Sequence, residues 1–252
     1  MTGFQPRTYR RSMQAADLTA FRVVVAESDL HVQVAAGPGE AGRELLEQCR
    51  ETALEATKTV RREIAAEIAL RPEFATSLEP IGLRPDATET IARMTRAAHS
   101  AGVGPMAAVA GAVAEFVARR LSALVSDVIV ENGGDLYIIT TRPRTIAVFA
   151  GDSPLSNRVA LQLPGPCELS VCTSSGTVGH SKSFGKADAA LIASGDGAFA
   201  DAAATALGNR VTSPQDIEAG LEWAASLDGV RQALIIVGSA MGVWGEFEIG
   251  RV

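Results

Sequence analysis

The chain has 252 residues, of which 47% are hydrophobic and 21% are charged, and these proportions exclude an intrinsically disordered protein. Its net charge of −6 gives no general attraction to nucleic acid or to anionic lipid, so we expect neither as a partner. Because no apolar run is long enough to span a membrane, no secretion signal follows the first residues and three cysteines make no disulfide framework, we expect a cytoplasmic protein.

The first half of the sequence predicts a hairpin followed by helices. Alternating apolar residues indicate strands, and apolar residues at steps of three and four indicate a helix face. The predicted elements are a hairpin over 20–36 that turns at Ser28-Asp29, a helix over 40–70 ended by Pro72, a loop over 72–86, a helix from an Asp86 N-cap through His99, and a helix over 105–124. The last of these is rich in alanine and glycine, so it would pack closely within one core or against another subunit.

The second half is richer in strands and predicts an α+β fold. A hairpin over 128–141 turns at Asn-Gly-Gly, and the strand RTIAVFAG continues the same sheet. Further strands are expected at 158–163, 167–172, 187–193, 233–238 and 243–249, and helices near 197–208 and 214–226. These elements lack regular βαβ alternation, which favours α+β over a doubly wound sheet. We expect one domain over 1–252, and the sequence leaves open whether its two halves repeat structurally.

The segment Cys172–Asp188, CTSSGTVGHSKSFGKAD, concentrates polar chemistry between two apolar strands. Glycines allow close backbone approach, and hydroxyls and lysines suit phosphate or carboxylate oxygens. The segment is not a P-loop, because five residues instead of four separate Gly179 from Gly185, and it contains no G-x-S-x-G hydrolase elbow. It is therefore a candidate ligand-binding segment, with a plain polar surface loop as the alternative.

Two acidic positions are weaker signals when taken alone. Asp201 and Thr205 lie four residues apart in a predicted helix and so share one face, where a carboxylate and a hydroxyl could hold a hard divalent cation. Spacing alone favours the alternative that both side chains simply face solvent. Asp135 ends an Asn-Gly-Gly-Asp sequence that is an ordinary hairpin turn on local chemistry, although its carboxylate could equally face a ligand.

Four segments in a fixed order resemble an uncharacterised family of the ApbE-like superfamily. They are GVGPMAAVAGAVAEFVARRL, ENGGDLYI, CTSSGTVGHSKSFGKADAALI and ADAAATALGNRV, and the resemblance covers roughly residues 70–212. The flavin transferases of this superfamily use magnesium to attach the FMN portion of FAD to a threonine of a partner protein. Their Gly-Gly-Asp turn is similar to Gly133-Gly134-Asp135, and their Asp-x-x-x-Thr magnesium motif is similar to Asp201 and Thr205.

The resemblance implies mixed, largely antiparallel sheets flanked by helices and a magnesium-assisted site for a phosphorylated small molecule such as FAD, FMN or another nucleotide. In that site Asp201 and Thr205 would hold Mg²⁺ and His180 would act as general acid/base. The implied ligand-binding residues are Asp135, Ser174, Ser175, Gly176, Thr177, Lys182 and Lys186. The chain has no counterpart of the transferases' His-x-x-Asp-Pro-Arg-Thr-Gly segment or of their Met-Gly-Thr opening, and both departures count against FMN transfer itself.

A second hypothesis is a non-catalytic or accessory protein in sulfur or cofactor metabolism, which would act on a protein partner. It rests on Cys172 beside the polar segment and on Cys167 five residues earlier. An odd separation along a strand points the two side chains to opposite faces, so they are poorly placed as a dithiol. The alternative interpretation, buried cysteines that act as small hydrophobic residues, is favoured.

Overall fold

The computed structural model describes residues 10, 13, 15–176 and 185–252. The strands are β1 (Thr19–Val25), β2 (Ser28–Val34), β3 (Val128–Asn132), β4 (Asp135–Thr140), β5 (Arg144–Ala147), β6 (Val159–Leu163), β7 (Cys167–Ser174), β8 (Ala189–Ser194), β9 (Val230–Val237), β10 (Ala240–Gly245) and β11 (Glu248–Arg251). The α-helices are α1 (Gly39–Leu70), α2 (Glu73–Thr76), α3 (Glu89–Ala101), α4 (Val109–Leu121), α5 (Gly197–Arg210) and α6 (Ile217–Ala225). Two 3₁₀ turns, η2 (Pro105–Ala108) and η3 (Pro214–Asp216), precede α4 and α6.

Two antiparallel sheets form the β structure of the described chain. The larger sheet has eight strands in the order β1-β2-β3-β4-β7-β8-β9-β10, and the smaller has three in the order β11-β6-β5. Every neighbouring pair in both sheets runs antiparallel. Together with the helices this confirms the predicted α+β fold.

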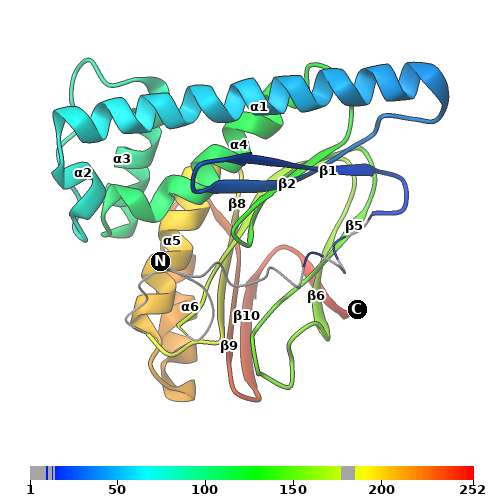
Figure 1. Ribbon diagram of the computed structural model, residues 1–252. Helices are drawn as coiled ribbons and strands as arrows, with labels where there is room; N and C mark the ends of the chain where they lie inside the picture. Colours follow the sequence, from blue (N-terminus) through cyan, green and yellow to red (C-terminus); the bar gives the residue numbers. More distant parts are fainter. Residues whose placement is uncertain (1–9, 11–12, 14, 177–184) are drawn as a thin grey trace.

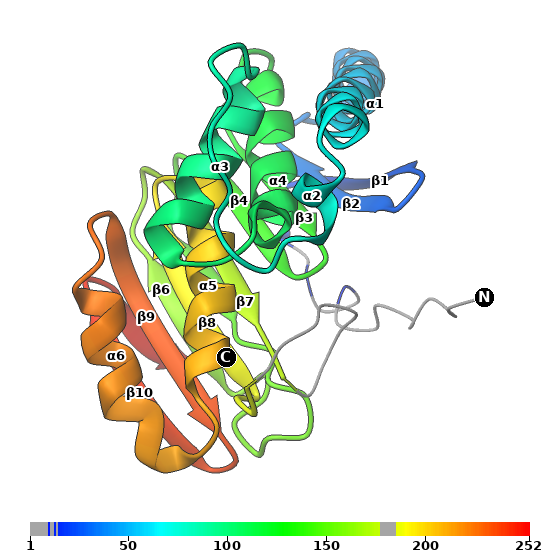
Figure 2. The same ribbon diagram turned by 90° about the vertical axis from the view of Figure 1, so that its left-hand side faces the viewer.

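The large sheet separates two hydrophobic cores. One core lies between the sheet and the helices, where α1 crosses above β1 and β2 while α4 and α5 lie against the central strands (Figure 1). The other lies between the sheet's opposite face and the small sheet (Figure 2). Alternation along the strands supplies both cores, because successive side chains point to opposite faces. In β7, for example, Val171 enters the second core and Cys172 the first.

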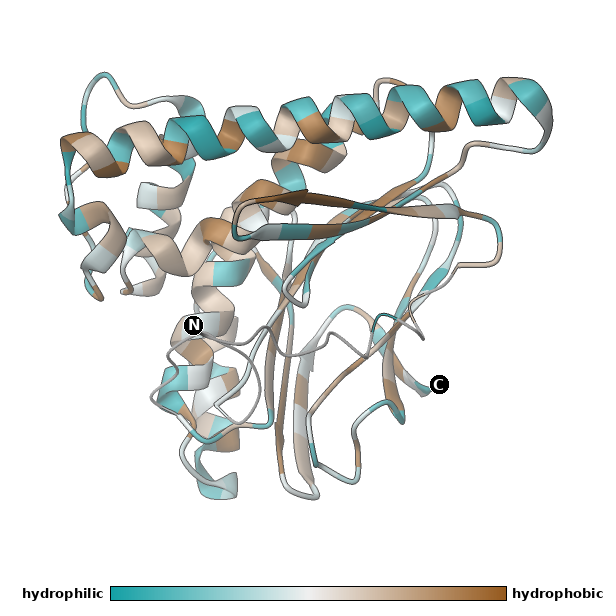
Figure 3. Ribbon diagram, viewed as in Figure 1, coloured by the Kyte–Doolittle hydropathy of each residue, from teal (hydrophilic) through white to brown (hydrophobic). Residues whose placement is uncertain are grey.

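The long helix α1 is amphipathic, as its spacing predicts. Cys49, Ala53, Val60 and Ile64 are buried on the face that packs against α4, α3 and the first two strands, while the outward face is charged. Coloured by hydropathy, α1 accordingly shows alternating hydrophilic and hydrophobic bands along its length (Figure 3). Burial of this stripe stabilises a helix that carries no side-chain N-cap.

Two predicted helix and turn signals at the N-terminal side are wrong. The first hairpin turns at Ala26-Glu27, with Ser28 already paired to Val25, because the Asp29 carboxylate forms ion pairs instead of shaping a turn. Helix α3 is capped by the Thr88 hydroxyl, and the predicted cap, Asp86, pairs with Arg84. The short helix α2 lies within the segment that the sequence predicts as a loop.

Two strand predictions are also wrong in detail. The strand RTIAVFAG does not continue the large sheet, since β5 pairs with β6 in the small one. The strand predicted over 243–249 is divided between β10 and β11, because Gly245 adopts a φ of 134° and the chain crosses there to the second sheet.

Among the described residues, no single helix has both the length and the apolar composition to cross a membrane. The bent pair made by α3 with the segment Pro105–Leu121 meets these limits only when both parts are counted together. Much of that pair is buried within the fold.

Asp127 fixes the junction of three strands just before β3. Its carboxylate accepts hydrogen bonds from the Thr141 N–H at 2.8 Å and from the Thr140 hydroxyl at 2.9 Å, and Arg144 lies 3.3 Å away. Burial alone would raise the pKa of Asp127, but the hydrogen bonds from Thr141, Ser126 and Thr140 outweigh it and hold the pKa well below its usual range.

We therefore predict that Asp127→Asn lowers the free energy of unfolding at pH 7 by about 1–3 kcal/mol. A depressed folded-state pKa stabilises the fold above the unfolded pKa of about 4 and loses that contribution as pH falls, so the difference from wild type should narrow by about 1 kcal/mol at pH 3. Urea denaturation at both pH values measures it. Asp152→Asn, at an exposed carboxylate, is the control, and a difference that is unchanged at pH 3 contradicts the assignment.

Candidate functional site

The candidate site lies on the helix-bearing face of the large sheet, where the β3–β4 turn and the end of β7 meet α4 and α5. The turn needs glycine, because Gly133 and Gly134 adopt φ values of 71° and 110°. Asp135 follows at the start of β4 and is 8% exposed. Its carboxylate accepts a hydrogen bond from the Thr173 N–H at 3.0 Å, which holds it against β7.

Helices α4 and α5 cross in direct backbone contact at this site. A Cβ on Gly111 would lie 2.0 Å from the Gly197 carbonyl oxygen and 2.9 Å from the Asp201 Cβ, so only glycine permits the approach. The Asp201 Oδ2 accepts hydrogen bonds from the N–H groups of Ala110 at 2.9 Å and Gly111 at 3.0 Å. Asp201 on α5 therefore caps the free N–H groups in the first turn of α4.

Asp135, which is buried, and Asp201, which is half-buried, form an acidic pair. Burial raises the pKa of Asp135 to about 7, with a further contribution from the Glu131 carboxylate. Burial also raises the pKa of Asp201, and the negative charge of Asp135 raises it further. Among the described residues, no cation lies beside these two carboxylates. The groups that donate hydrogen bonds to them are backbone N–H groups and the Cys172 thiol. The ionised pair therefore requires added positive charge or a shared proton.

Thr205 lies one helical turn after Asp201 and is half-buried on the same face of α5. Its hydroxyl makes no hydrogen bond to the described part of the chain. The described hydrogen bonds of the Asp201 carboxylate all go to its Oδ2 atom. No group of three or more His, Cys, Asp or Glu side chains within the described ranges is arranged as a metal centre. A cation here would therefore need oxygen atoms from a ligand or from water in addition to these side chains.

The ends of the predicted ligand-binding segment lie along α5. The Ser174 hydroxyl lies near Gly208, where an added Cβ would come within 3.0 Å of it. The Gly176 N–H donates to the Ala187 carbonyl and the Lys186 N–H to the Val211 carbonyl, at 2.9 and 2.8 Å, so both backbone groups are engaged within the chain. Ser175 is half-buried beside them. Thr177, His180 and Lys182 lie outside the described residues.

The positions of Cys167 and Cys172 agree with the interpretation that their spacing favours, in which the two side chains point to opposite faces of the sheet. Cys167 and Cys172 enter opposite cores, and Cys172 is fully buried. Burial raises the pKa of the Cys172 thiol, and the carboxylates of Asp135 and Asp201 raise it further. This thiol therefore serves the packing and hydrogen bonding of the acidic pair and is not an activated nucleophile.

Glu115 is a residue of the site region to which the sequence analysis assigns no role. Its carboxylate is 1% exposed and accepts from Arg93 at 2.6 Å, from Arg119 at 2.7 Å and from the Gly197 N–H at 2.8 Å. It thereby joins α3, α4 and the first turn of α5. The available signal was a lone carboxylate on the buried face of an alanine-rich helix.

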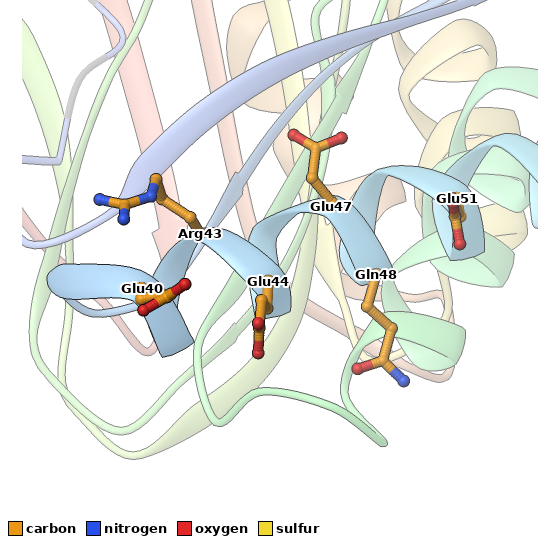
Figure 4. Close-up of a pocket in the computed structure, with 6 residues that line it drawn as sticks. All are labelled: Glu40, Arg43, Glu44, Glu47, Gln48 and Glu51. Atoms are coloured by element: carbon orange, nitrogen blue, oxygen red, sulfur yellow. The ribbon is translucent and has the colours of Figure 1, made fainter.

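A separate hollow of about 470 Å³ lies along the N-terminal half of α1 (Figure 4). It is lined by Glu40, Arg43, Glu44, Glu47, Gln48 and Glu51, all from this one helix. None of these side chains belongs to the acidic pair or to the polar segment, so we assign the hollow no part in the site.

Comparisons with known proteins identify relatives along most of the chain. The family model described as AbpE bacteria matches residues 10–236. A UPF0280 protein from Methanosarcina acetivorans is 40% identical over 198 residues, which cover 78% of this chain and 78% of that protein. A UPF0280 protein from Methanopyrus kandleri is 38% identical over 233 residues and covers 90% of both.

Solved structures share the fold at lower identity. A variant of the flavin transferase ApbE from Vibrio cholerae has a TM-score of 0.51 at 14% identity and covers 91% of this chain and 97% of its own. The ApbE protein from Thermotoga maritima has a TM-score of 0.51 at 13% identity and covers 89% and 96%. At these identities the comparison establishes the fold, and it confirms the predicted ApbE-like architecture.

The raised pKa values predict how the acidic pair affects stability. When the pKa of a carboxyl group is raised in the folded state, the protein loses stability as pH rises from the unfolded pKa of about 4 to the folded pKa, which is about 7 for Asp135. Without metal, Asp135→Asn should therefore become more stable relative to wild type between pH 4 and pH 8, by more than about 1 kcal/mol. The Asn side chain can still accept the Thr173 N–H. Urea denaturation in a chelator measures the difference.

Asp216 provides a control of opposite sign. Hydrogen bonds from the Thr212 backbone and hydroxyl and from Ser213 lower the pKa of Asp216. The stabilisation by Asp216 is consequently lost only as pH falls below the unfolded pKa of about 4, so Asp216→Asn should show almost no change relative to wild type between pH 5 and pH 8 and a relative gain only below pH 4. If Asp216→Asn gains stability between pH 5 and pH 8 as Asp135→Asn does, the assignment of Asp135 and Asp201 as an acidic pair with raised pKa values is contradicted.

Proposed function

The chain belongs to the family described as AbpE bacteria, and on this premise we propose that it binds Mg²⁺ together with a phosphorylated small molecule at the Asp135–Asp201 site. The observation that carries the proposal is this acidic pair, whose pKa values are raised and beside which the described residues place no cation. Such a pair is unfavourable for folding alone, because desolvated carboxylates are costly unless they are paired or coordinate a metal.

The donor atoms of the site fit Mg²⁺. This ion prefers oxygen ligands and is commonly held by one or two carboxylates, with substrate phosphates and water completing its shell. Asp201 and Thr205 supply a carboxylate and a hydroxyl one turn apart on the rigid helix α5. When bound, the ion would polarise a phosphate oxygen and offset its charge. Asp135 adds negative charge behind this position and would strengthen the affinity for the cation.

A flavin nucleotide such as FAD or FMN is the ligand class that we propose first, because the Vibrio cholerae protein of the same fold is named a flavin transferase. Ser174 and Ser175 stand at the open end of β7 and would donate hydroxyl hydrogen bonds to phosphate oxygens. Lys186, which is exposed near the C-terminal end of the polar segment, would offset their charge. We assign His180 the general acid/base role and Lys182 a further charge contact.

The proposal is ligand binding and phosphate chemistry, and it does not extend to FMN transfer onto a protein. We exclude transfer from the proposal because this sequence lacks the His-x-x-Asp-Pro-Arg-Thr-Gly segment and the Met-Gly-Thr opening of the transferases. The accessory role in sulfur metabolism gains no support from Cys172, which is buried and whose thiol pKa is raised. An accessory role in cofactor metabolism becomes the next hypothesis if no nucleotide binds.

Calorimetry with FAD, FMN, ADP and ATP, with and without Mg²⁺, tests the proposal. We expect Mg²⁺-dependent binding of FAD or FMN that weakens at least about tenfold in Asp201→Asn, which corresponds to about 1.4 kcal/mol. Asparagine keeps an oxygen that can accept the Ala110 and Gly111 N–H groups, so the loss would report the missing charge and not a broken helix cap.

Asp196→Asn is the matched control. Asp196 also caps a helix, since its carboxylate accepts from the Phe199 N–H at the start of α5, and it pairs with Arg93 outside the acidic pair. This variant should bind the nucleotide with unchanged Mg²⁺ dependence. Equal affinity of the Asp201→Asn protein and wild type would overturn the metal assignment, and absence of binding to all four nucleotides would overturn the ligand assignment.

A further inference from the structure

Strand β10 forms one edge of the large sheet, and its sequence has neither the charged residues nor the proline that normally prevent an edge strand from pairing with another chain. Within the described ranges it pairs with β9 alone. Its six residues, AMGVWG, include no charged residue and no proline. Natural edge strands are usually blunted by charges, prolines or covering segments, because free N–H and C=O groups otherwise template pairing with another chain.

The side chains of β10 are apolar and exposed. Met241 is 40% exposed, Val243 37% and Trp244 41%. Met241 and Val243 share the face of Ile236 and Leu234, whereas Trp244 lies on the face covered by α6. The edge therefore presents apolar surface on both sides of an unpaired backbone.

The opposite edge of the same sheet shows the contrast. Strand β1 carries Arg22, which forms an ion pair with Asp29 at 2.6 Å, and α1 packs across the strand. Figure 1 shows α1 lying over β1 and β2, while β10 runs at the other end of the sheet. Val24 is exposed on β1, yet the neighbouring arginine would oppose pairing with an identical strand.

The hairpin geometry fixes which groups of β10 are free. β9 and β10 are joined by the two-residue turn Gly238-Ser239, so the flanking residues Val237 and Ala240 exchange backbone hydrogen bonds. Pairing alternates from there, and the N–H and C=O groups of Met241 and Val243 consequently point outward.

We propose that the free edge of β10 binds β10 of a second copy of this chain in an antiparallel pair with its twofold axis at Val243. In this register Val243 exchanges both backbone hydrogen bonds with its own counterpart, and Trp244 lies opposite Gly242 of the second copy. A large side chain opposite a glycine avoids a clash between two bulky residues.

Charge favours a second copy over a charged partner segment. Each molecule carries a net charge of −6, so two copies associate only where their acidic groups stay apart. β10 brings no charge to the pair, and the next residue in the chain, Glu246, is neutralised by Arg231 at 2.8 Å. An acidic or basic strand from another protein would find no counter-charge on this edge. A single-strand contact is small, so we expect an interface in the weak class.

Sedimentation velocity over about 1 to 100 µM protein tests the proposal. We expect wild type to shift from monomer to dimer across this range. Val243→Lys should remain monomeric, because it places two ammonium groups opposite each other at the twofold axis. Val24→Lys on β1 is the matched control and should dimerise like wild type. Thermal denaturation of dilute samples shows whether the variants keep the fold.

Hydrogen exchange on wild type supplies a measurement without mutation. The Met241 and Val243 amides should exchange at least about tenfold more slowly in concentrated than in dilute protein, whereas the β1 amides should not change. A monomer at every concentration overturns the proposal and leaves the edge to a strand of a different protein. A dimer that persists in Val243→Lys overturns it as well. So do exchange rates of the β10 amides that are the same in dilute and concentrated protein.

Discussion

The close crossing of α4 and α5 is the constraint on which the candidate site depends. Because Gly111 and Gly197 have no Cβ, the helices meet backbone to backbone, and only at this separation does the Asp201 carboxylate reach the first N–H groups of α4. The positive end of the α4 dipole then partly offsets the charge of Asp201. The same contact that builds the helix layer thus places a carboxylate beside Asp135, where folding alone would not favour it.

A second carboxylate secures this crossing from the other side. Glu115 accepts from Arg93 and from the Gly197 N–H, so α5 begins at a position set by α3 and α4 together. Glu115 is buried beside Arg93 and Arg119, which compensate its charge, whereas no cation among the described residues pairs with Asp135 or Asp201. Two acidic sites about one turn of helix apart therefore play opposite physical roles. One stabilises the helix layer, and the other is left with charge that a ligand can neutralise.

Local patterns in the sequence predicted most elements but not the contacts that make the site. The period of α1 and the Asn-Gly-Gly turn before Asp135 are local signals, and both elements form where expected. The Asp201 contact with Gly111 joins residues that are 90 positions apart, and no spacing encodes it. The small sheet was missed for the same reason, since the alternation of β5 specifies a strand without naming its neighbour.

The order of strands keeps the two proposed activities of the molecule apart. The acidic site uses β4 and β7 in the middle of the large sheet, and β10 lies three strands beyond β7. With neighbouring strands about 4.8 Å apart, the dimer edge is roughly 14 Å from the site strands. Pairing at β10 would extend the sheet without covering α4 or Ser174 beside α5. Self-association and ligand binding should therefore be separable by mutation, because among the described residues β10 contacts mainly β9 and α6, whereas the acidic pair lies on β4 and α5.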